Sequence, residues 1–299
     1  MPQVTANGLK IEYESFGPRN APPIVLIMGL GAQLVLWPLE LVHGLVDRGF
    51  RVIRFDNRDI GLSEKIDAPA PNLALNMFSS RLGFAVKAPY TLHDMARDTV
   101  GLLDALEIEA AHIVGASMGG MIAQVVAAVH PERTSSLTSI MSTTGEPRVS
   151  MPSLGIVKKV FFSRPKRGSR GDVIDYYVAM FQAIGSPGFE RDEALMREMM
   201  TRMVERSYHP AGVARQTAAI LATGDRSPML RHVTAPTLVI HGDADPLVPL
   251  AGGIDTAKKI AGARIEIIPG MGHDLPQQLI PKFVELVGEH AEAAEGARV

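Results

Sequence analysis

Short aliphatic runs alternate along the chain with longer segments of helical period, and this alternation restricts the fold more than any other feature of the sequence. Buried parallel strands read as continuous Val, Ile and Leu runs, whereas crossover helices carry an apolar stripe. The pattern therefore predicts an α/β fold with a mostly parallel eight-stranded sheet flanked by helices. Strands are expected at residues 3–6, 9–16, 22–28, 51–56, 111–115, 135–142, 236–242 and 263–270.

Local signals refine this outline. Asn7-Gly8 between the first two strands is typical of a two-residue hairpin turn, so these strands are predicted to be antiparallel. Thr91 is the expected N-cap of a helix over 91–107, with Asp94 in its first turn. Further helices are predicted over 37–48, 118–130, between the last two strands, and near 276–290, and residues 292–299 are expected to be frayed.

Composition excludes several classes of protein. The chain has 299 residues, 46% of them hydrophobic, with 30 basic and 32 acidic residues, so a sizeable core is expected and nucleic acid is not an expected partner. There is no cysteine, which excludes disulfides and thiolate metal sites. The first residues lack the pattern of a secretory signal, and we expect a cytoplasmic protein.

The apolar run 110–129 is long enough to resemble a membrane span. Its polar residues His112, Ser117 and Gln124, and the glycines around the serine, favour a strand that turns into a helix. No membrane span is therefore predicted.

A serine occupies this turn. Gly115-Ala116-Ser117-Met118-Gly119 matches the G-x-S-x-G pattern, with a strand before it and a helix after it. Such a turn projects the hydroxyl out of the sheet edge and places helix N-terminal N–H groups beside it. Small residues at such turns also serve close packing alone, so the motif needs a base and an orienting acid elsewhere in the chain.

Two later loops supply candidates for these partners. His273 lies in a glycine-rich loop directly after the last predicted strand, whereas the other eight histidines fit structural positions. Asp243 and Asp245 follow the strand 236–242, and both could be simple turn formers. Asp245 is the favoured acid because Pro246 follows it and presents it further from the turn. A calcium loop is excluded because the other ligands are missing.

The order Ser117, Asp245, His273, each after a strand, resembles the α/β-hydrolase superfamily. The resemblance covers nearly the whole chain apart from its middle, and it is carried by "IMGLGAQ", "VIRFDNRDIGLS", "GASMGG", "LVIHGDADPLVP" and "IIPGMGHDLP". Within the superfamily, "MGLGAQ", "LWP" and "FDNRDIGLS" are similar to the aclacinomycin methylesterase branch, which hydrolyses a methyl ester on a polyketide.

The resemblance also implies an oxyanion hole. Met28 to Gly31 would be its loop, and the backbone N–H groups of Leu30 and Met118 would be its donors. The chain departs from the usual pattern because Met28 stands where a histidine commonly braces the loop. Asp59 stands where the family often has glycine, and Arg58 and Ser63 are interpreted as structural residues that tie this loop to its neighbours.

The middle of the chain interrupts the alternation, since 143–235 contains no convincing strand. We predict a helical cap over 146–212, inserted between core segments 1–145 and 213–299. The cap methionines fit one helical face, which is typical of a packed cap core, with a flexible substrate wall as the alternative. The basic run from Lys158 to Arg170 is interpreted as a solvated cap loop rather than a membrane-surface or anionic-substrate patch.

These features together predict a serine hydrolase that cleaves a carboxylic ester of a fairly apolar small molecule through an acyl-enzyme. No metal or organic cofactor is expected, and a homodimer is compatible with the sequence. A cofactor-independent C–C bond hydrolase, or a perhydrolase of haloperoxidase type, would use the same triad. A hydrolase-like protein that binds a small apolar ligand without turnover is the non-enzymatic alternative.

Overall fold

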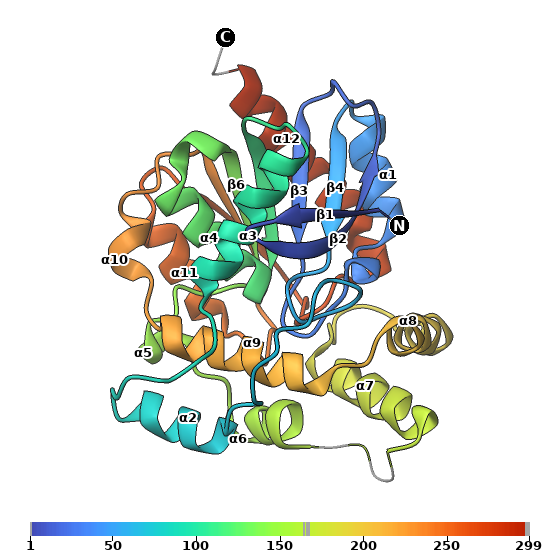
Figure 1. Cartoon of the computed structure of the whole chain (residues 1–299). Coiled ribbons are helices and arrows are strands. Elements are labelled where there is room, and N and C mark those ends of the chain that lie inside the picture. Colours follow the sequence, from blue (N-terminus) through green and yellow to red (C-terminus); the bar gives the residue numbers. More distant parts are fainter. Residues whose placement is uncertain (1, 164, 166–167, 297–299) are drawn as a thin grey trace.

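An eight-stranded sheet forms the centre of the protein (Figure 1). The computed structural model describes residues 2–163, 165 and 168–296. The strands lie in the order β1-β2-β4-β3-β5-β6-β7-β8; the first two are antiparallel to their neighbours and the others pair in parallel. Their bounds are β1 Gln3–Ala6, β2 Leu9–Phe16, β3 Pro23–Ile27, β4 Arg51–Phe55, β5 Ala111–Ala116, β6 Thr134–Ile140, β7 Thr237–Gly242 and β8 Arg264–Ile268. The predicted mostly parallel sheet is thus confirmed, with every strand close to its expected position.

The turn between β1 and β2 has the predicted hairpin geometry. Asn7 and Gly8 have φ of 48° and 78°, and the register pairs Ala6 with Leu9 across the turn. Two consecutive positive φ angles are characteristic of the tight turns that match the twist of antiparallel strands.

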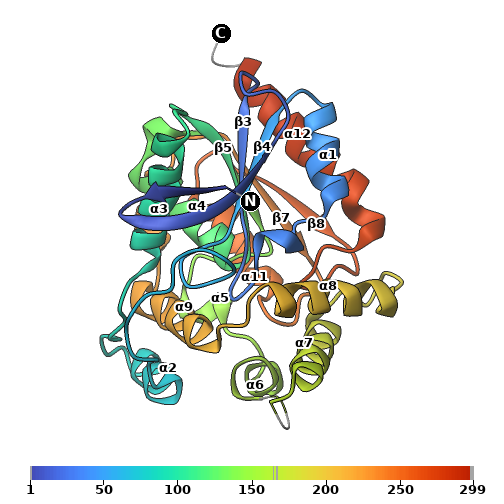
Figure 2. The ribbon, with the colours of Figure 1, turned by 45° about the vertical axis from the view of Figure 1, so that its right-hand side comes forward.

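Helices cover both faces of the sheet. In Figures 1 and 2, α1 and α12 lie together on one side of the sheet and α3 and α4 on the other. The bounds in the sheet-covering part are η1 Leu34–Leu36, α1 Leu39–Asp47, α3 Leu92–Ala105, α4 Met118–Val129, η2 Pro131–Arg133, α10 Ser227–Leu230, α11 Leu250–Lys259, η4 Gln277–Leu279 and α12 Ile280–Gly296. The predicted cap of α3 is present, because Thr91 and Asp94 form a reciprocal capping box.

Two apolar clusters form the core, one on each face of the sheet. Successive residues of β3 alternate between them: Val25 and Ile27 belong to the cluster with α3 and α4, and Ile24 and Leu26 to the cluster with α1 and α12. This alternation follows from the two-residue period of a strand. Strands buried on both faces must be apolar throughout, which explains the continuous aliphatic runs in the sequence.

The apolar run 110–129 forms β5 and α4, as predicted. Among the described residues, no helix combines the length and the hydropathy that crossing a lipid bilayer requires.

The C-terminal helix is longer than predicted. Residues 292–296, expected to be frayed, are the last residues of α12, and 297–299 lie outside the described residues. Both guanidinium nitrogens Nε and Nη2 of Arg48 donate to the Glu292 carboxylate at 2.9 and 2.8 Å, so this part of the helix is held against α1. Such a bidentate pairing is not visible from local sequence.

Helices and loops without strands connect β6 to β7, in the region of the predicted cap (Figure 1). They are α5 Pro147–Ser150, α6 Leu154–Val157, η3 Lys158–Phe162, α7 Arg170–Ile184, α8 Glu193–Arg206 and α9 Pro210–Thr223, followed by α10. The division of the chain at 146 and 212 stays a prediction, and the second limit falls in the first turn of α9.

The helix α2, Leu73–Arg81, was missed from sequence. It packs against α9 and lies at the same end of the molecule as the helices between β6 and β7 (Figures 1 and 2). Its two leucines and its phenylalanine do not form a buried stripe, since Leu75 and Phe78 are exposed, and the only buried residue of the helix is Asn76. Without an apolar period, the helical pattern is absent from the sequence.

A buried ion pair joins α9 to the loop after β4. Asp59 has φ 73° and is fully buried, and its carboxylate accepts hydrogen bonds from Arg215 at 2.9 and 2.7 Å and from the Tyr90 hydroxyl at 2.7 Å. Burial alone would raise the pKa of Asp59, but the hydrogen bonds from Arg215 and Tyr90 outweigh it and hold the pKa below its usual value. Asp59 therefore anchors α9 to the loop after β4.

The neighbouring residues have the predicted structural roles. Arg58 donates two hydrogen bonds of 2.6 Å to the buried Asp98 of α3. Ser63 accepts the Glu12 N–H at 2.9 Å and donates to the Asp56 carbonyl at 2.6 Å. The loop is thus fixed to the sheet and to α3.

Replacement of Arg215 by alanine is expected to lower the free energy of unfolding by about 3–5 kcal/mol, because it leaves the Asp59 charge buried without its partner. Arg197→Ala is the matched control, since Arg197 pairs with Asp175 at 2.6 Å on the exposed surface of the same region. That variant should change stability by less than about 1 kcal/mol. Urea denaturation of both variants measures the difference, and equal losses would contradict the anchoring role of Asp59.

Candidate active site

The site begins with the backbone of Ser117. This residue follows β5, precedes the first residue of α4, and has φ 56° and ψ −120°, a region that residues other than glycine rarely adopt. The surrounding structure holds it there: its N–H donates to the Ile140 carbonyl at 2.9 Å, and its carbonyl accepts from the Ser142 hydroxyl at 2.8 Å. The strained turn presents the hydroxyl above the carboxyl edge of the sheet.

The flanking glycines are required by close approach of backbone. A Cβ on Gly115 would lie 2.1 Å from the Gly119 carbonyl oxygen, and one on Gly119 would lie 2.0 Å from the Ile27 carbonyl oxygen. Any side chain at either position would push α4 away from β3 and β5, and would displace Ser117 with it.

The three residues predicted from different loops meet at this point. The Ser117 hydroxyl lies 2.8 Å from Nε2 of His273, and Nδ1 of His273 lies 2.7 Å from a carboxylate oxygen of Asp245. The other Asp245 oxygen accepts the N–H groups of Leu247 and Val248 at 2.9 and 2.8 Å. An imidazole that donates from Nδ1 to a carboxylate has Nε2 free to accept the serine proton.

The structure separates the two candidate acids. Asp243 accepts the Gly270 N–H at 2.7 Å and thereby joins the loops after β7 and β8. Asp245, and not Asp243, contacts His273. The sequence preference for Asp245 agrees with this geometry.

A second histidine, His241, lies beside the acid and has a structural position, as the sequence suggested. Its Nε2 donates to the Val248 carbonyl at 2.9 Å and lies 3.7 Å from Asp245. Burial lowers the pKa of His241, which keeps the ring neutral next to the loop. It therefore supports the backbone that carries Asp245.

The predicted oxyanion loop lies directly beside the serine. A Cβ on Gly29 would lie 3.1 Å from the Ser117 Cβ, so the turn that carries the Leu30 N–H passes next to the hydroxyl. Met118 is the first residue of α4, and its N–H has no acceptor within the helix. Both amides can thus point toward an oxygen bound at Ser117.

Side chains from α9 and from the loop after β4 hold this loop where the family's histidine is missing. The buried Gln216 of α9 accepts the Gly31 N–H at 2.9 Å and donates to the Arg58 carbonyl at 2.9 Å. Asn57 donates to the Met28 carbonyl at 2.9 Å. These two amides were missed from sequence, because the pairing of Gly31 with a residue 185 positions away has no local signal.

The segment after α7 holds the loop after β8, which carries His273 and is called the base loop below, in the same way. The His273 N–H donates to the Ile184 carbonyl at 2.7 Å, and the Gly272 N–H donates to the Ser186 hydroxyl at 2.8 Å. Ser186 in turn donates from its N–H and its hydroxyl to Asp274. Burial raises the pKa of Asp274, and the hydrogen bonds from Ser186 oppose that shift. The cap region and the base loop are thereby joined through backbone contacts.

A cavity of about 1100 Å³ opens above the serine. Its lining includes Ser117, His273, the oxyanion loop and many apolar side chains of the cap region, among them Tyr177, Met180, Phe181, Met196 and Met199. Met200 also borders it and is almost fully buried, as is Met203 beneath. Met200 and Met203 are therefore packed, as the sequence favoured, and Met180, Met196, Met199 and Met200 line the cavity, whereas Met151 is exposed.

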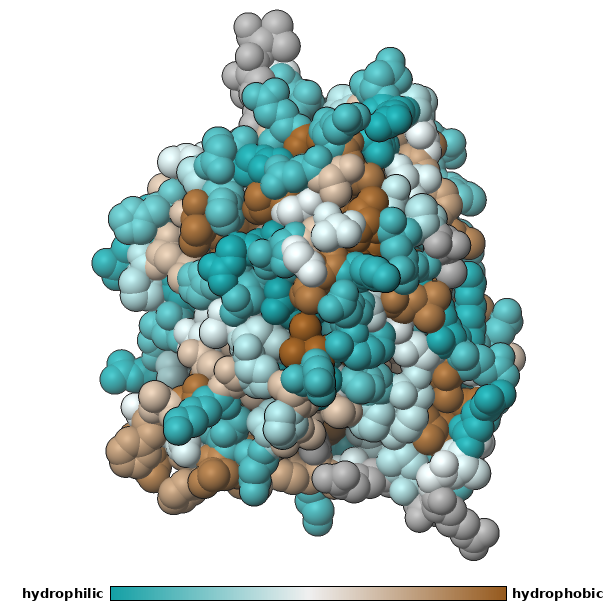
Figure 3. All heavy atoms as spheres, in the orientation of Figure 1, coloured by the Kyte–Doolittle hydropathy of each residue, from teal (hydrophilic) through white to brown (hydrophobic). Residues whose placement is uncertain are grey.

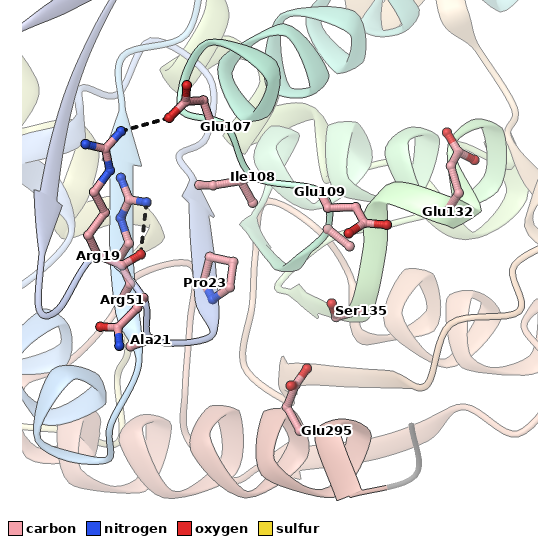
Figure 4. Close-up of a pocket in the computed structure, with 12 residues that line it drawn as sticks. Arg19, Ala21, Pro23, Arg51, Glu107, Ile108, Glu109, Glu132, Ser135 and Glu295 are labelled. Atoms are coloured by element: carbon pink, nitrogen blue, oxygen red, sulfur yellow. Dashed lines mark hydrogen bonds and ion pairs between the residues drawn. The ribbon is translucent and has the colours of Figure 1, made fainter. Parts of the chain in front are cut away.

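A second cavity, of about 510 Å³, lies at the other edge of the sheet, where β3, β4 and β6 begin (Figure 4). Charged side chains line it, including the ion pair of Arg19 and Glu107 at 3.1 Å. Among the described residues, no histidine borders this cavity, and no cluster of three or more His, Asp or Glu side chains in the described chain is arranged to hold a metal. Ligands of open α/β sheets bind at the carboxyl ends of the strands, so the cavity above Ser117 is the candidate active site.

Residues 22–276 match the family model described as alpha/beta hydrolase fold. The chain belongs to the α/β-hydrolase fold family. The fold and family predicted from the sequence are thereby confirmed.

Relatives extend over nearly the full chain. The chain is 27% identical to rhodomycin D methylesterase DauP of Streptomyces sp. (strain C5), over 97% of this chain and 98% of that protein. It is 30% identical to 2-hydroxymuconate semialdehyde hydrolase of Pseudomonas sp. (strain CF600), over 99% and 95%. The predicted resemblance to the aclacinomycin methylesterase branch is supported by the first of these relatives.

A solved structure shows the same fold. The enol-lactonase from Burkholderia xenovorans LB400 superposes with a TM-score of 0.74 at 27% identity, covering 97% of this chain and all of that one.

Replacement of Gln216 by leucine is expected to lower kcat for a chromogenic ester by about ten-fold, because the oxyanion loop loses its acceptor for the Gly31 N–H. KM should change little, since the cavity wall is intact. Gln124→Leu is the control: Gln124 is equally buried in α4, donates to the Ser139 hydroxyl at 3.3 Å and accepts from Nε of the buried Arg226 at 3.3 Å, and neither partner belongs to the loop. Steady-state kinetics of both variants provides the measurement, and a kcat that is unchanged in Gln216→Leu, or equally lowered in Gln124→Leu, would argue against bracing by Gln216.

Proposed function

We propose that this protein is a serine hydrolase that cleaves a carboxylic ester of a bulky, fairly apolar small molecule. The observation that carries the proposal is the continuous hydrogen-bonded series from Ser117 through His273 to Asp245 at the floor of a large apolar cavity. Neither a buried ion pair nor a packing turn requires a hydroxyl, an imidazole and a carboxylate in this order.

In the proposed reaction each group has one role. His273 Nε2 takes the hydroxyl proton as Ser117 Oγ attacks the ester carbonyl carbon, and Asp245 stabilises the imidazolium that forms. The backbone N–H groups of Leu30 and Met118 stabilise the oxyanion. When the C–O bond breaks, the alcohol leaves with the proton held by His273, and an acyl group remains on Ser117.

Water completes the reaction. His273 removes a proton from a water molecule that attacks the acyl carbonyl carbon, and the same proton returns to Ser117 Oγ as the carboxylic acid leaves. All the groups in this scheme belong to the chain, and we predict that no metal or organic cofactor takes part.

The shape of the cavity supports a bulky substrate. About 1100 Å³ is at the upper end of the range for small-molecule sites, and most of the lining area comes from apolar atoms. Two rhodomycin D methylesterases are among the relatives that match over nearly the full length of the chain. A methyl ester on a bulky apolar acyl group is therefore the substrate class that we propose.

C–C bond hydrolysis beside a ketone is the second candidate on the same triad. It is favoured by the 30% identity to 2-hydroxymuconate semialdehyde hydrolase and by relatives named 2-hydroxy-6-oxononadienedioate/2-hydroxy-6-oxononatrienedioate hydrolase. A panel of nitrophenyl and methyl esters, assayed beside a vinylogous diketone, separates the two reactions. Faster turnover of the diketone would assign the second candidate.

Two further sequence predictions concern the setting of the protein. A cytoplasmic location and a homodimer both stay predictions, which fractionation of the producing cells and light scattering of the purified protein would measure.

Ser117→Ala is expected to remove nearly all ester hydrolysis, because the chain offers no other nucleophile at this position, while the thermal unfolding midpoint stays close to that of the unchanged protein. The unchanged protein should also form a covalent adduct with a fluorophosphonate at Ser117, detected by mass spectrometry. Full turnover in the variant would refute the assignment, and absence of labelling in the folded protein would support a binding protein without turnover.

Asp245→Asn is expected to lower kcat by about three to four orders of magnitude, since an asparagine cannot stabilise the imidazolium or fix its tautomer. Asp243→Asn is the matched control on the same loop, and it should lose far less because the Asp243 carboxylate accepts the Gly270 N–H at the turn and is not the one that contacts His273. The reverse ranking of the two kcat values would transfer the role of the acid to Asp243.

A further inference from the structure

Exposed apolar side chains are concentrated at one end of the molecule. Seven of the twelve large apolar side chains exposed among the described residues come from two short stretches, 72–84 and 151–162, and they are Leu75, Phe78, Leu82, Phe84, Met151, Leu154 and Phe162. Figure 3 shows apolar residues gathered at the lower left, where Figure 1 places α2. Such a concentration is unusual on a monomeric surface and indicates a contact surface.

The charge of the same segments is one-sided. Residues 68–93 and 147–171 contain nine of the chain's 30 basic residues and none of its 32 acidic residues. Six of the nine are described and all six are exposed: Arg81, Lys87, Arg148, Lys158, Lys159 and Arg170. The rest of the chain has 21 basic and 32 acidic residues, so these two segments attract a negatively charged partner more strongly than the remainder does.

Both segments contribute residues to the lining of the active-site cavity. Its lining includes residues 70–74, which lead into α2, and Val160, Phe162 and Ser163 of the second segment. Figures 1 and 2 both place α2 and α6 beyond α9, at the end of the molecule farthest from the C-terminal helix. We name this surface, made of residues 72–87 and 147–163, the cap face.

We propose that the cap face docks on an anionic lipid bilayer, with the cavity mouth directed toward the lipid. This gives Lys158 and Lys159 the membrane-surface role that the sequence alone disfavoured against a solvated loop. The occupant is set by the combination of side chains: phenylalanines and leucines enter the headgroup region, while lysines and arginines at the same level pair with lipid phosphates. Apolar insertion alone, or basic side chains alone, gives weak and reversible association with a membrane, whereas the two together give stable association. A second copy of the chain would oppose like charges on the same face, which disfavours self-association there.

This arrangement also suits the chemistry of the cavity. An ester with a bulky apolar group partitions into a bilayer, and a mouth seated on lipid receives it without passage of the apolar group through water. The structure thus gives a peripheral contact, in which no segment of the described chain needs to span the membrane.

The test measures sedimentation of the full-length protein with two kinds of vesicle, phosphatidylcholine alone and equal parts phosphatidylcholine and phosphatidylglycerol, at low and high salt. We expect about ten-fold greater partitioning onto the anionic vesicles, weakened by salt. Lys158→Glu/Lys159→Glu and, separately, Phe78→Ser/Phe84→Ser should each lower that partitioning about ten-fold. None of these four residues is among the described residues that line the cavity.

Lys258→Glu/Lys259→Glu is the matched control, because these adjacent lysines lie in the last turn of α11, outside residues 72–87 and 147–163, and their reversal changes net charge by the same amount. Partitioning lowered equally in this control, equal binding to both vesicle types, or no binding to either would overturn the proposal. Concentration-dependent dimers that Phe78→Ser/Phe84→Ser dissociates, without vesicle binding, would assign the face to a second copy instead. Binding is measured without substrate, so the outcome is independent of the proposed ester hydrolysis.

Discussion

The backbone conformation of Ser117 is the constraint on which the site depends. A positive φ at a residue with a side chain costs about 1–3 kcal/mol and persists only where its surroundings leave no alternative. Here β5 and α4 enter the turn from opposite sides, two glycines let backbone approach backbone, and hydrogen bonds to Ile140 and Ser142 close the remaining freedom. The packing of the apolar core on both faces of the sheet thus keeps the Ser117 hydroxyl within hydrogen-bond distance of His273.

The cap region contributes to the site as much as the core does. Gln216 on α9 holds the oxyanion loop, and Ser186 after α7 holds the base loop, while the Asp59 to Arg215 pair fixes α9 to the sheet. Each contact satisfies a backbone or side-chain group that would otherwise be buried without a partner. The walls of the cavity and the groups at its floor therefore belong to one hydrogen-bonded assembly, in which α9 and the loop after β4 hold the loop that begins at Met28.

Most of the sheet and the three side chains that meet at Ser117 could be predicted, because buried parallel strands and a glycine-flanked serine leave direct traces in local sequence. The choice of Asp245 over Asp243 rested on the proline that follows it, and the structure agrees. Gln216, Asn57 and Ser186 were missed because their partners lie far away in the chain, and a single sequence does not show which polar side chain meets which distant amide. The helix α2 was missed because its apolar residues face outward, which removes the periodic signal.

The contacts between residues 184–188 and 270–274 limit which segments of this protein can be exchanged for those of a relative. Gly188 donates to the Gly270 carbonyl at 3.0 Å, and their Cα atoms approach so closely that a Cβ on either would lie within 2.8 Å of the other. If the helices between β6 and β7 were replaced and this contact changed, the imidazole of His273 would move together with the walls of the cavity. Selectivity and proton transfer are thus inherited together, and a chimera retains both only when it exchanges the two strips of chain as a pair.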